Sequence, residues 1–198
     1  MTAEQHGVGT ADEATVGGRP DHSAERSPDR TPGRYLDAGE RRRAVRLTRT
    51  VPAAAIALVV ALYAAAAASG MMPLQWVSHV DGRGNAQYSA HWPLVTAAVA
   101  AAAVAFVVGW LLAREHAQAG HWHDLEKGIV VAAYGTGHGL LGVVIANIAA
   151  SLGRPAATAG QEQMGLALLG FVLAFIAAAV VYTATLPKAR GDRWTPRY

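Results

Sequence analysis

Few side chains in this 198-residue chain could carry chemistry, and most of these are histidines. Three histidines lie near three carboxylates in the sequence: His116, His121, His123, Glu115, Asp124 and Glu126. Imidazoles and carboxylates this close together are potential ligands for Zn²⁺ or another divalent ion. Their spacing matches no established metal signature. We therefore expect neither a metal centre nor a cofactor, and the three histidines are weak metal candidates.

His138 differs from the other histidines because it lies inside a long uncharged stretch. Tyr134 precedes it by one helical turn, and Tyr63 should reach a similar depth in another such stretch. Burying a polar group in a long apolar segment costs free energy, so such a group is by default a candidate for a functional role. We expect His138 to form a hydrogen bond with Tyr63 or Tyr134. Two roles are open for His138. It is a structural histidine within the bundle, or it takes part in a proton relay or in ligand binding.

A third group of polar residues lies between residues 70 and 91. His79, Asp81 and His91 would converge if this segment folds back on itself. The segment also holds a proline that should end the preceding helix and a glycine that can adopt the positive φ of a tight turn. We interpret four residues as a candidate ligand or partner loop: Pro73, His79, Asp81 and Gly84.

Long apolar segments must position all of these residues. They span residues 51–69, 92–112, 128–150 and 164–186, and none contains Asp, Glu, Lys or Arg. A helix needs roughly 20 residues to cross a hydrocarbon core of ~30 Å, and a soluble helix of that length would need a polar face. The sequence therefore predicts an all-α membrane protein, with a four-transmembrane-helix bundle at residues 46–190.

The ends of the chain are polar. Residues 1–45 are rich in Gly, Pro, Ser and charged residues, which predicts a disordered tail, and residues 191–198 form a second, short tail. Five arginines stand before the first apolar segment: Arg41, Arg42, Arg43, Arg46 and Arg49. Each contributes about 1 kcal/mol beside an anionic leaflet. We expect this cluster to face anionic lipid headgroups, and we expect no nucleic-acid partner.

Basic residues also indicate the topology. They gather before the first segment, after the fourth, and between the second and third, whereas Arg83 and Arg154 stand alone in the other two connections. The positive-inside rule then places both termini in the cytoplasm and residues 70–91 outside. The excess of arginine over lysine, with much alanine and glycine, suggests a GC-rich bacterial genome. The predicted location is the bacterial cell membrane.

Small residues dominate the predicted helices. The first two apolar segments are mainly alanine, and the third contains the pair Gly135 and Gly139 at small-xxx-small spacing. Small side chains allow helix backbones to approach closely. We expect a tight bundle, a homo-oligomer or a membrane-protein partner.

Residues 51–112 resemble a bacterial membrane family of unknown function. The family loop reads roughly Leu-Pro-x-x-(Ile/Val)-Pro-x-His-(Phe/Trp)-x-x-x-Gly-x-Pro-Asp, and Pro73, His79 and Gly84 match its first proline, its histidine and its glycine. Ser78 and Val80 depart from its second proline and its aromatic residue. The same module opens SdpI-type immunity and signalling proteins. In SdpI-type proteins the resemblance implies immunity to a secreted toxin coupled to sequestration of a transcription repressor, and it thus implies a cytoplasmic regulator as a partner here.

The resulting functional hypothesis is an integral membrane protein that senses a signal or confers immunity through residues 70–91. The alternatives are a small oligomeric transporter or channel, and a structural subunit of a membrane complex. The sequence has no cysteine, no nucleophile–base pair and no phosphate loop, so we do not expect an enzyme.

Overall fold

The computed structural model describes residues 36–119, 123–154 and 161–189. The chain divides into two units, residues 1–33 and residues 34–198, and all of the helices and strands described lie in the second unit. Residues 1–35 of the predicted tail at 1–45 lie outside the described residues, as do the predicted tail at 191–198 and His121.

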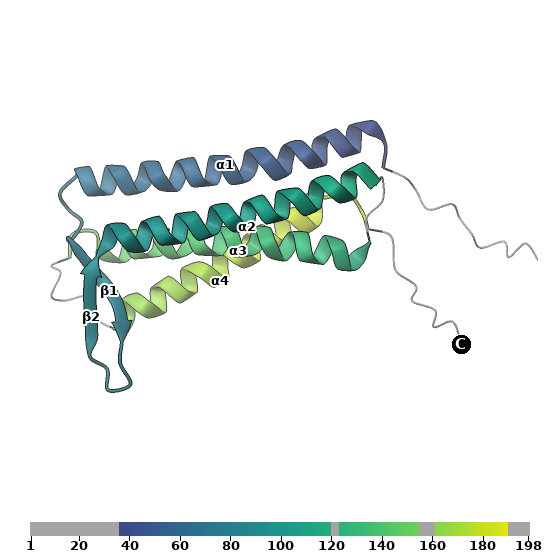
Figure 1. Cartoon of the computed structure of the whole chain (residues 1–198). Helices are drawn as coiled ribbons and strands as arrows, with labels where there is room; N and C mark the ends of the chain where they lie inside the picture. Colours follow the sequence, from purple (N-terminus) through teal and green to yellow (C-terminus); the bar gives the residue numbers. More distant parts are fainter. Residues whose placement is uncertain (1–35, 120–122, 155–160, 190–198) are drawn as a thin grey trace, which may run out of the picture. The chain divides into compact units, whose positions relative to one another are not determined.

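Four long helices form the body of the unit: α1 (Ala38–Ala68), α2 (His91–Ala119), α3 (Asp124–Ser151) and α4 (Gln161–Thr185). All four are long and apolar enough to cross a membrane, and they contain the four predicted spans almost completely. The helices run lengthwise beside one another (Figure 1). The predicted four-span fold is confirmed, and the protein is an integral membrane protein.

The chain between α1 and α2 is an antiparallel hairpin of strands β1 (Gln75–Val80) and β2 (Ala86–Ala90). The all-α prediction omitted this sheet. The hairpin lies across one end of the bundle, so that its strands run roughly crosswise to the helices (Figure 1). We call this the hairpin end, and we call the opposite end, where α1 begins, the arginine end.

Helix α1 begins and ends at residues that the sequence interpretation did not choose. Asp37 caps its start: the backbone N of Glu40 donates to Oδ1 of Asp37 at 2.7 Å, and the backbone N of Asp37 donates to Oε2 of Glu40 at 3.2 Å. The predicted tail boundary at residue 45 is therefore too late. At the other end Gly70 has φ +68°, beyond the C-cap Ser69, so a left-handed glycine and not Pro73 ends the helix.

Helix α3 is the centre of the bundle, since it packs against α1, α2 and α4. Its contact with α4 is the most extensive, and glycines make it close. A Cβ added at Gly170 would lie 2.6 Å from the Cβ of Ala146 on α3. Added Cβ atoms at Gly135 and Gly139 would overlap Phe175 and Phe171 of α4. The predicted packing face at Gly135 and Gly139 is confirmed, and it receives aromatic rings.

Helix α1 docks on α3 through a backbone carbonyl. Pro52 lies inside α1 and is buried. Because proline has no amide hydrogen, the carbonyl of Thr48, four residues earlier, has no helical partner. The hydroxyl of Tyr134 on α3 donates to that carbonyl at 2.8 Å. A side chain from the central helix therefore occupies the gap that proline makes in α1.

Candidate functional site

The tip of the hairpin is an ordered turn built around Asp81. Its carboxylate accepts hydrogen bonds from the backbone N of Arg83 at 2.9 Å and from the backbone N and the side-chain Nδ2 of Asn85 at 2.8 and 2.9 Å. Gly84 has φ +86°, as its predicted role in a tight turn requires. His79 precedes the turn and is exposed. Asp81 and Gly84 therefore shape the turn.

The turn should respond to acid. The side-chain hydrogen bond from Asn85, followed by the backbone N–H of Asn85, holds the pKa of Asp81 below its ordinary value. A pKa that is lowered in the folded state stabilises the turn at neutral pH, and this stabilisation is lost as pH falls from about 4 through the folded-state pKa. We expect the Asn85 amide resonance in NMR to titrate with a midpoint below that of an ordinary aspartate.

Asp81→Asn is the control for this titration, because the amide has no proton to gain in that range. Its Asn85 resonance should stay constant from neutral pH down through the titration of the original chain. A titration midpoint at or above that of an ordinary aspartate would contradict the proposed role of the Asn85 hydrogen bonds.

The base of the hairpin is buried against the helices. Trp76 and Val77 of β1 lie over α2 and α4, and the backbone N of Val77 is 3.5 Å from Oε1 of Gln163 on α4. Among the described residues, neither Nε1 of Trp76 nor Nε2 of Gln163 has a hydrogen-bond partner, although both atoms are buried. A cavity of about 190 Å³ is lined by Trp76 and Val77, by the polar residues Ser78 and Asn147, and by apolar side chains of the helices; Gln163 does not line it.

His91 lies at this base and not at the tip. The strand register pairs Gln75 with Ala90 at the base and Val80 with Ala86 at the tip. At ~3.3 Å per residue the two ends are ~17 Å apart. The predicted convergence of His79, Asp81 and His91 is therefore wrong.

The ring of His91 instead joins the hairpin to α1. Its centroid is 5.7 Å from that of Trp76, and its Nδ1 is 2.7 Å from the hydroxyl of Tyr63. The predicted pairing of Tyr63 with His138 is also wrong, because Tyr134 lies level with Thr48. At ~1.5 Å per residue, Tyr63 is ~22 Å further along α1 than Thr48.

The middle of the bundle holds an aromatic cluster around His138. Nδ1 of His138 is 3.0 Å from the backbone carbonyl of Tyr134, so His138 does pair with Tyr134, through the main chain. Phe106 and Tyr182 meet the His138 ring edge-on, at 4.9 and 5.7 Å between centroids. His138 and Tyr182 also line a cavity of about 330 Å³ between α1, α3 and α4. Among the described residues the buried hydroxyl of Tyr182 has no hydrogen-bond partner.

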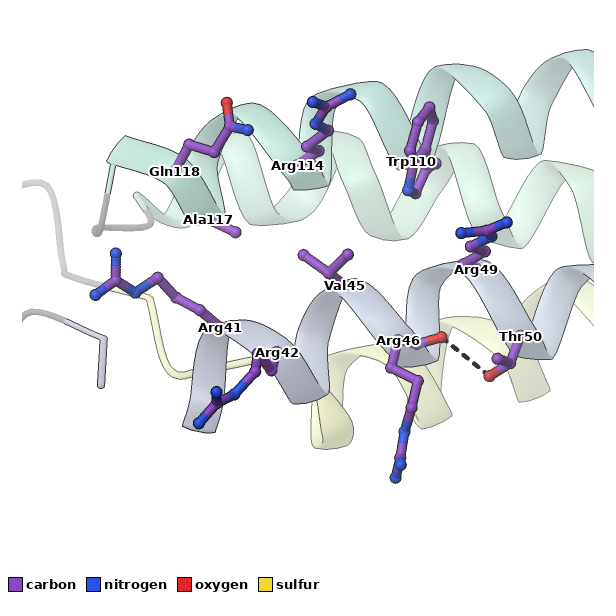
Figure 2. A pocket seen from close by; sticks show the side chains of 10 residues that line it. All are labelled: Arg41, Arg42, Val45, Arg46, Arg49, Thr50, Trp110, Arg114, Ala117 and Gln118. Atoms are coloured by element: carbon purple, nitrogen blue, oxygen red, sulfur yellow. Dashed lines mark hydrogen bonds between the residues drawn. The ribbon is translucent and has the colours of Figure 1, made fainter. Parts of the chain in front are cut away.

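The arginine end has a groove between α1 and α2, with a volume of about 610 Å³ (Figure 2). Four of the five clustered arginines line it, and α2 adds a fifth: Arg41, Arg42, Arg46, Arg49 and Arg114. Figure 2 shows that Arg49 lies between α1 and Trp110, whereas Arg46 extends away from α2. The guanidinium of Arg114 lies 5.6 Å from the ring centroid of Trp110. Arg43 does not line the groove.

Among the described residues, which include His116 and His123, no group of three or more potential metal ligands gathers. His116 and Glu126 do meet: Nδ1 of His116 is 3.3 Å from Oε2 of Glu126. The backbone N of His123 donates to the same carboxylate at 3.2 Å. The Glu126 carboxylate therefore links the end of α2 to the start of α3.

Comparisons with known proteins give no relative. No protein-family model, curated protein or solved structure matches this chain.

Several residues of these sites were missing from the sequence interpretation: Trp76, Gln163, Trp110, Arg114 and Tyr182. One signal was available, because a polar-tipped aromatic residue near a span end is a common interfacial residue. This sequence feature does not identify the residues that the aromatic side chain contacts.

Proposed function

We propose that this protein is a membrane sensor or immunity protein of the bacterial cell membrane, and that it recognises an extracytoplasmic ligand at the base of its hairpin. The observation that carries the proposal is the buried, unpartnered indole Nε1 of Trp76, a residue that lines a cavity of about 190 Å³. Buried donors without a partner are costly, and a ligand that supplies acceptors would relieve that cost.

The chemistry of the base suggests a peptide. An indole N–H donor at a mainly apolar cavity suits a backbone carbonyl flanked by an apolar side chain. Among the described residues, β1 is the only strand that pairs with β2, and an extended peptide can add to a sheet as a further strand. The resemblance of residues 51–112 to the SdpI-type module favours the same ligand class, a secreted peptide, with a cytoplasmic regulator as the second partner.

A signal would pass through side chains that already touch. Trp76 contacts His91, and His91 is hydrogen-bonded to Tyr63 on α1. A ligand that moves Trp76 would change this contact. Helix α1 is continuous from Tyr63 to the arginine end, where the regulator would bind.

The sidedness can be tested with single cysteines, because the chain has none of its own. Arg83 lies at the hairpin tip, and Glu115 is exposed near the arginine end. We expect a membrane-impermeant maleimide to label Arg83→Cys in intact spheroplasts, and Glu115→Cys only after permeabilisation. The reverse pattern would overturn the proposed orientation.

The function can be tested by protection of cells. Cells that lack the chain should be more sensitive than producing cells to the peptide fraction of the source bacterium's culture medium. Trp76→Phe keeps an aromatic ring but removes the donor, so it should lose protection. Trp92→Phe is the matched control, because Trp92 is exposed and does not line the cavity. Equal sensitivity with and without the chain, or full protection by Trp76→Phe, would overturn the proposal.

A further inference from the structure

The groove at the arginine end continues into an apolar second part. The two parts share Arg49 and Trp110, and the second part has a volume of about 420 Å³. It runs between α1 and α2 as far as Ile56 and Ala103. Arg49 and Ile56 are two helical turns apart, which is ~10 Å of helix at ~1.5 Å per residue.

The mouth of the groove favours an anion. Arginines line it, no carboxylate does, and within the part of the chain that the structure describes none of these arginines forms an ion pair. Nε1 of Trp110 is buried and has no hydrogen-bond partner among the described residues. In Figure 2 this nitrogen is at the end of the ring nearer to α1. Guanidinium and indole N–H groups are all donors, as a phosphate requires.

The inner part favours a hydrocarbon chain. Thr48, Pro52 and Phe106 form a buried floor, whereas Ala53 and Val107 are exposed at its edges. The hydroxyl of Thr48 donates to backbone carbonyls of its own helix. Its hydrogen is therefore not available to a ligand in the groove. The exposed edges leave the groove open along the span, where lipid lies.

We propose that this groove binds one anionic phospholipid, with its phosphate among the arginines beside Trp110 and an acyl chain over Pro52 and Phe106. A free phosphate would fill only the mouth, and a neutral lipid would leave the arginines without a counter-charge. The proposal does not depend on the hairpin function, since the groove lies at the opposite end of the bundle.

The test uses the full chain in lipid nanodiscs that contain phosphatidylglycerol and phosphatidylcholine, with native mass spectrometry to count retained lipids. We expect one retained phosphatidylglycerol and no preference for phosphatidylcholine. Arg49→Gln should lower phosphatidylglycerol retention about tenfold, because a charge-assisted hydrogen bond is lost. Arg43→Gln is the matched control: it removes the same charge outside the groove, so only general attraction to the leaflet is weakened and retention should fall clearly less than for Arg49→Gln.

Two further variants separate the headgroup from the acyl chain. Trp110→Phe removes the indole N–H and should lower retention about fivefold. Ala103→Leu fills the inner groove and should also displace the lipid, whereas Ala101→Leu, exposed and outside the groove, should not. Circular dichroism would verify that each variant is folded.

Equal losses for Arg49→Gln and Arg43→Gln would overturn the proposal, because general attraction to the leaflet would then explain binding. Retention that survives Ala103→Leu would also overturn it, because the acyl chain would then lie elsewhere. If glycerol phosphate, added free, displaces the lipid at equal concentration, the site recognises a soluble phosphate and the lipid assignment is wrong.

Discussion

Replacing Gly142 with alanine is expected to lower the free energy of unfolding by about 1–3 kcal/mol. The added Cβ would lie 2.6 Å from the Cβ of Ala174 and would also meet the backbone of Gly170 on α4. A backbone cannot rotate aside as a flexible side chain can. Helices α3 and α4 would therefore have to separate along the most extensive contact of the bundle. Titration with SDS in mixed micelles, followed by circular dichroism, measures this loss.

Gly128→Ala is the control for this substitution. Gly128 lies on the same helix, but an added Cβ there would meet no atom within 4 Å. Alanine is favoured over glycine inside a helix by about 1 kcal/mol, so this variant should be as stable as the original chain or slightly more stable. The two variants should then differ clearly in stability. A Gly142→Ala protein as stable as the original would contradict the close approach at Gly142 and Gly170.

The four spans could be predicted because their cause is chemical and local. A stretch without Asp, Glu, Lys or Arg of the required length has few alternatives to a membrane helix. The start of α1 could also have been read from the capping pattern of Asp37 and Glu40. The polar composition around them instead favoured a tail that extends to residue 45.

The hairpin was harder to predict because its strands are short. Residues 75–80 alternate only partly, and Ser78 falls in an irregularity of the register between Val77 and His79. The burial of Trp76 depends on α4, whose Gln163 is 86 residues away from Val77 in the sequence. A local sequence pattern cannot predict a contact between residues this far apart in the sequence.

The depth of a residue in the membrane was also misjudged from the sequence. Counting from the first apolar residue placed Tyr63 near His138, but α1 begins at Ala38 and its Thr48 lies level with Tyr134.

The groove at the arginine end was not predicted for a related reason. Which arginines of the cluster face α2 depends on the rotation of α1 about its axis, and the long run of arginines does not define that rotation.

Tyr134→Phe is expected to lower the free energy of unfolding by about 1–2 kcal/mol, as measured by the same SDS titration. The phenylalanine ring would keep the packing with Tyr182, whose ring is 4.5 Å away between centroids. Only the hydroxyl that donates to the carbonyl of Thr48 would be lost. That carbonyl is buried and has no hydrogen-bond donor within α1, because Pro52 has no amide hydrogen.

Pro52→Ala should rescue Tyr134→Phe. Alanine restores an amide hydrogen four residues after Thr48, so the carbonyl regains a partner within α1. In this background Tyr134→Phe should cost less than about 0.5 kcal/mol, which makes the two substitutions non-additive. Tyr63→Phe is the matched control, since it removes a tyrosine hydroxyl that bonds to His91 near the other end of α1. Its cost should be the same with and without the Pro52→Ala substitution, as expected for distant sites.

The cycle decides how α1 is held. If Tyr134→Phe costs the same with proline or alanine at position 52, the hydroxyl does not replace the missing helical hydrogen bond. Apolar contact alone would then fix α1 against α3. If the cost disappears in the Pro52→Ala background, one proline and one tyrosine set the level of α1 in the bundle. The same pair would then also set the depth at which Arg49 meets Trp110, since both arginine and proline belong to one continuous helix.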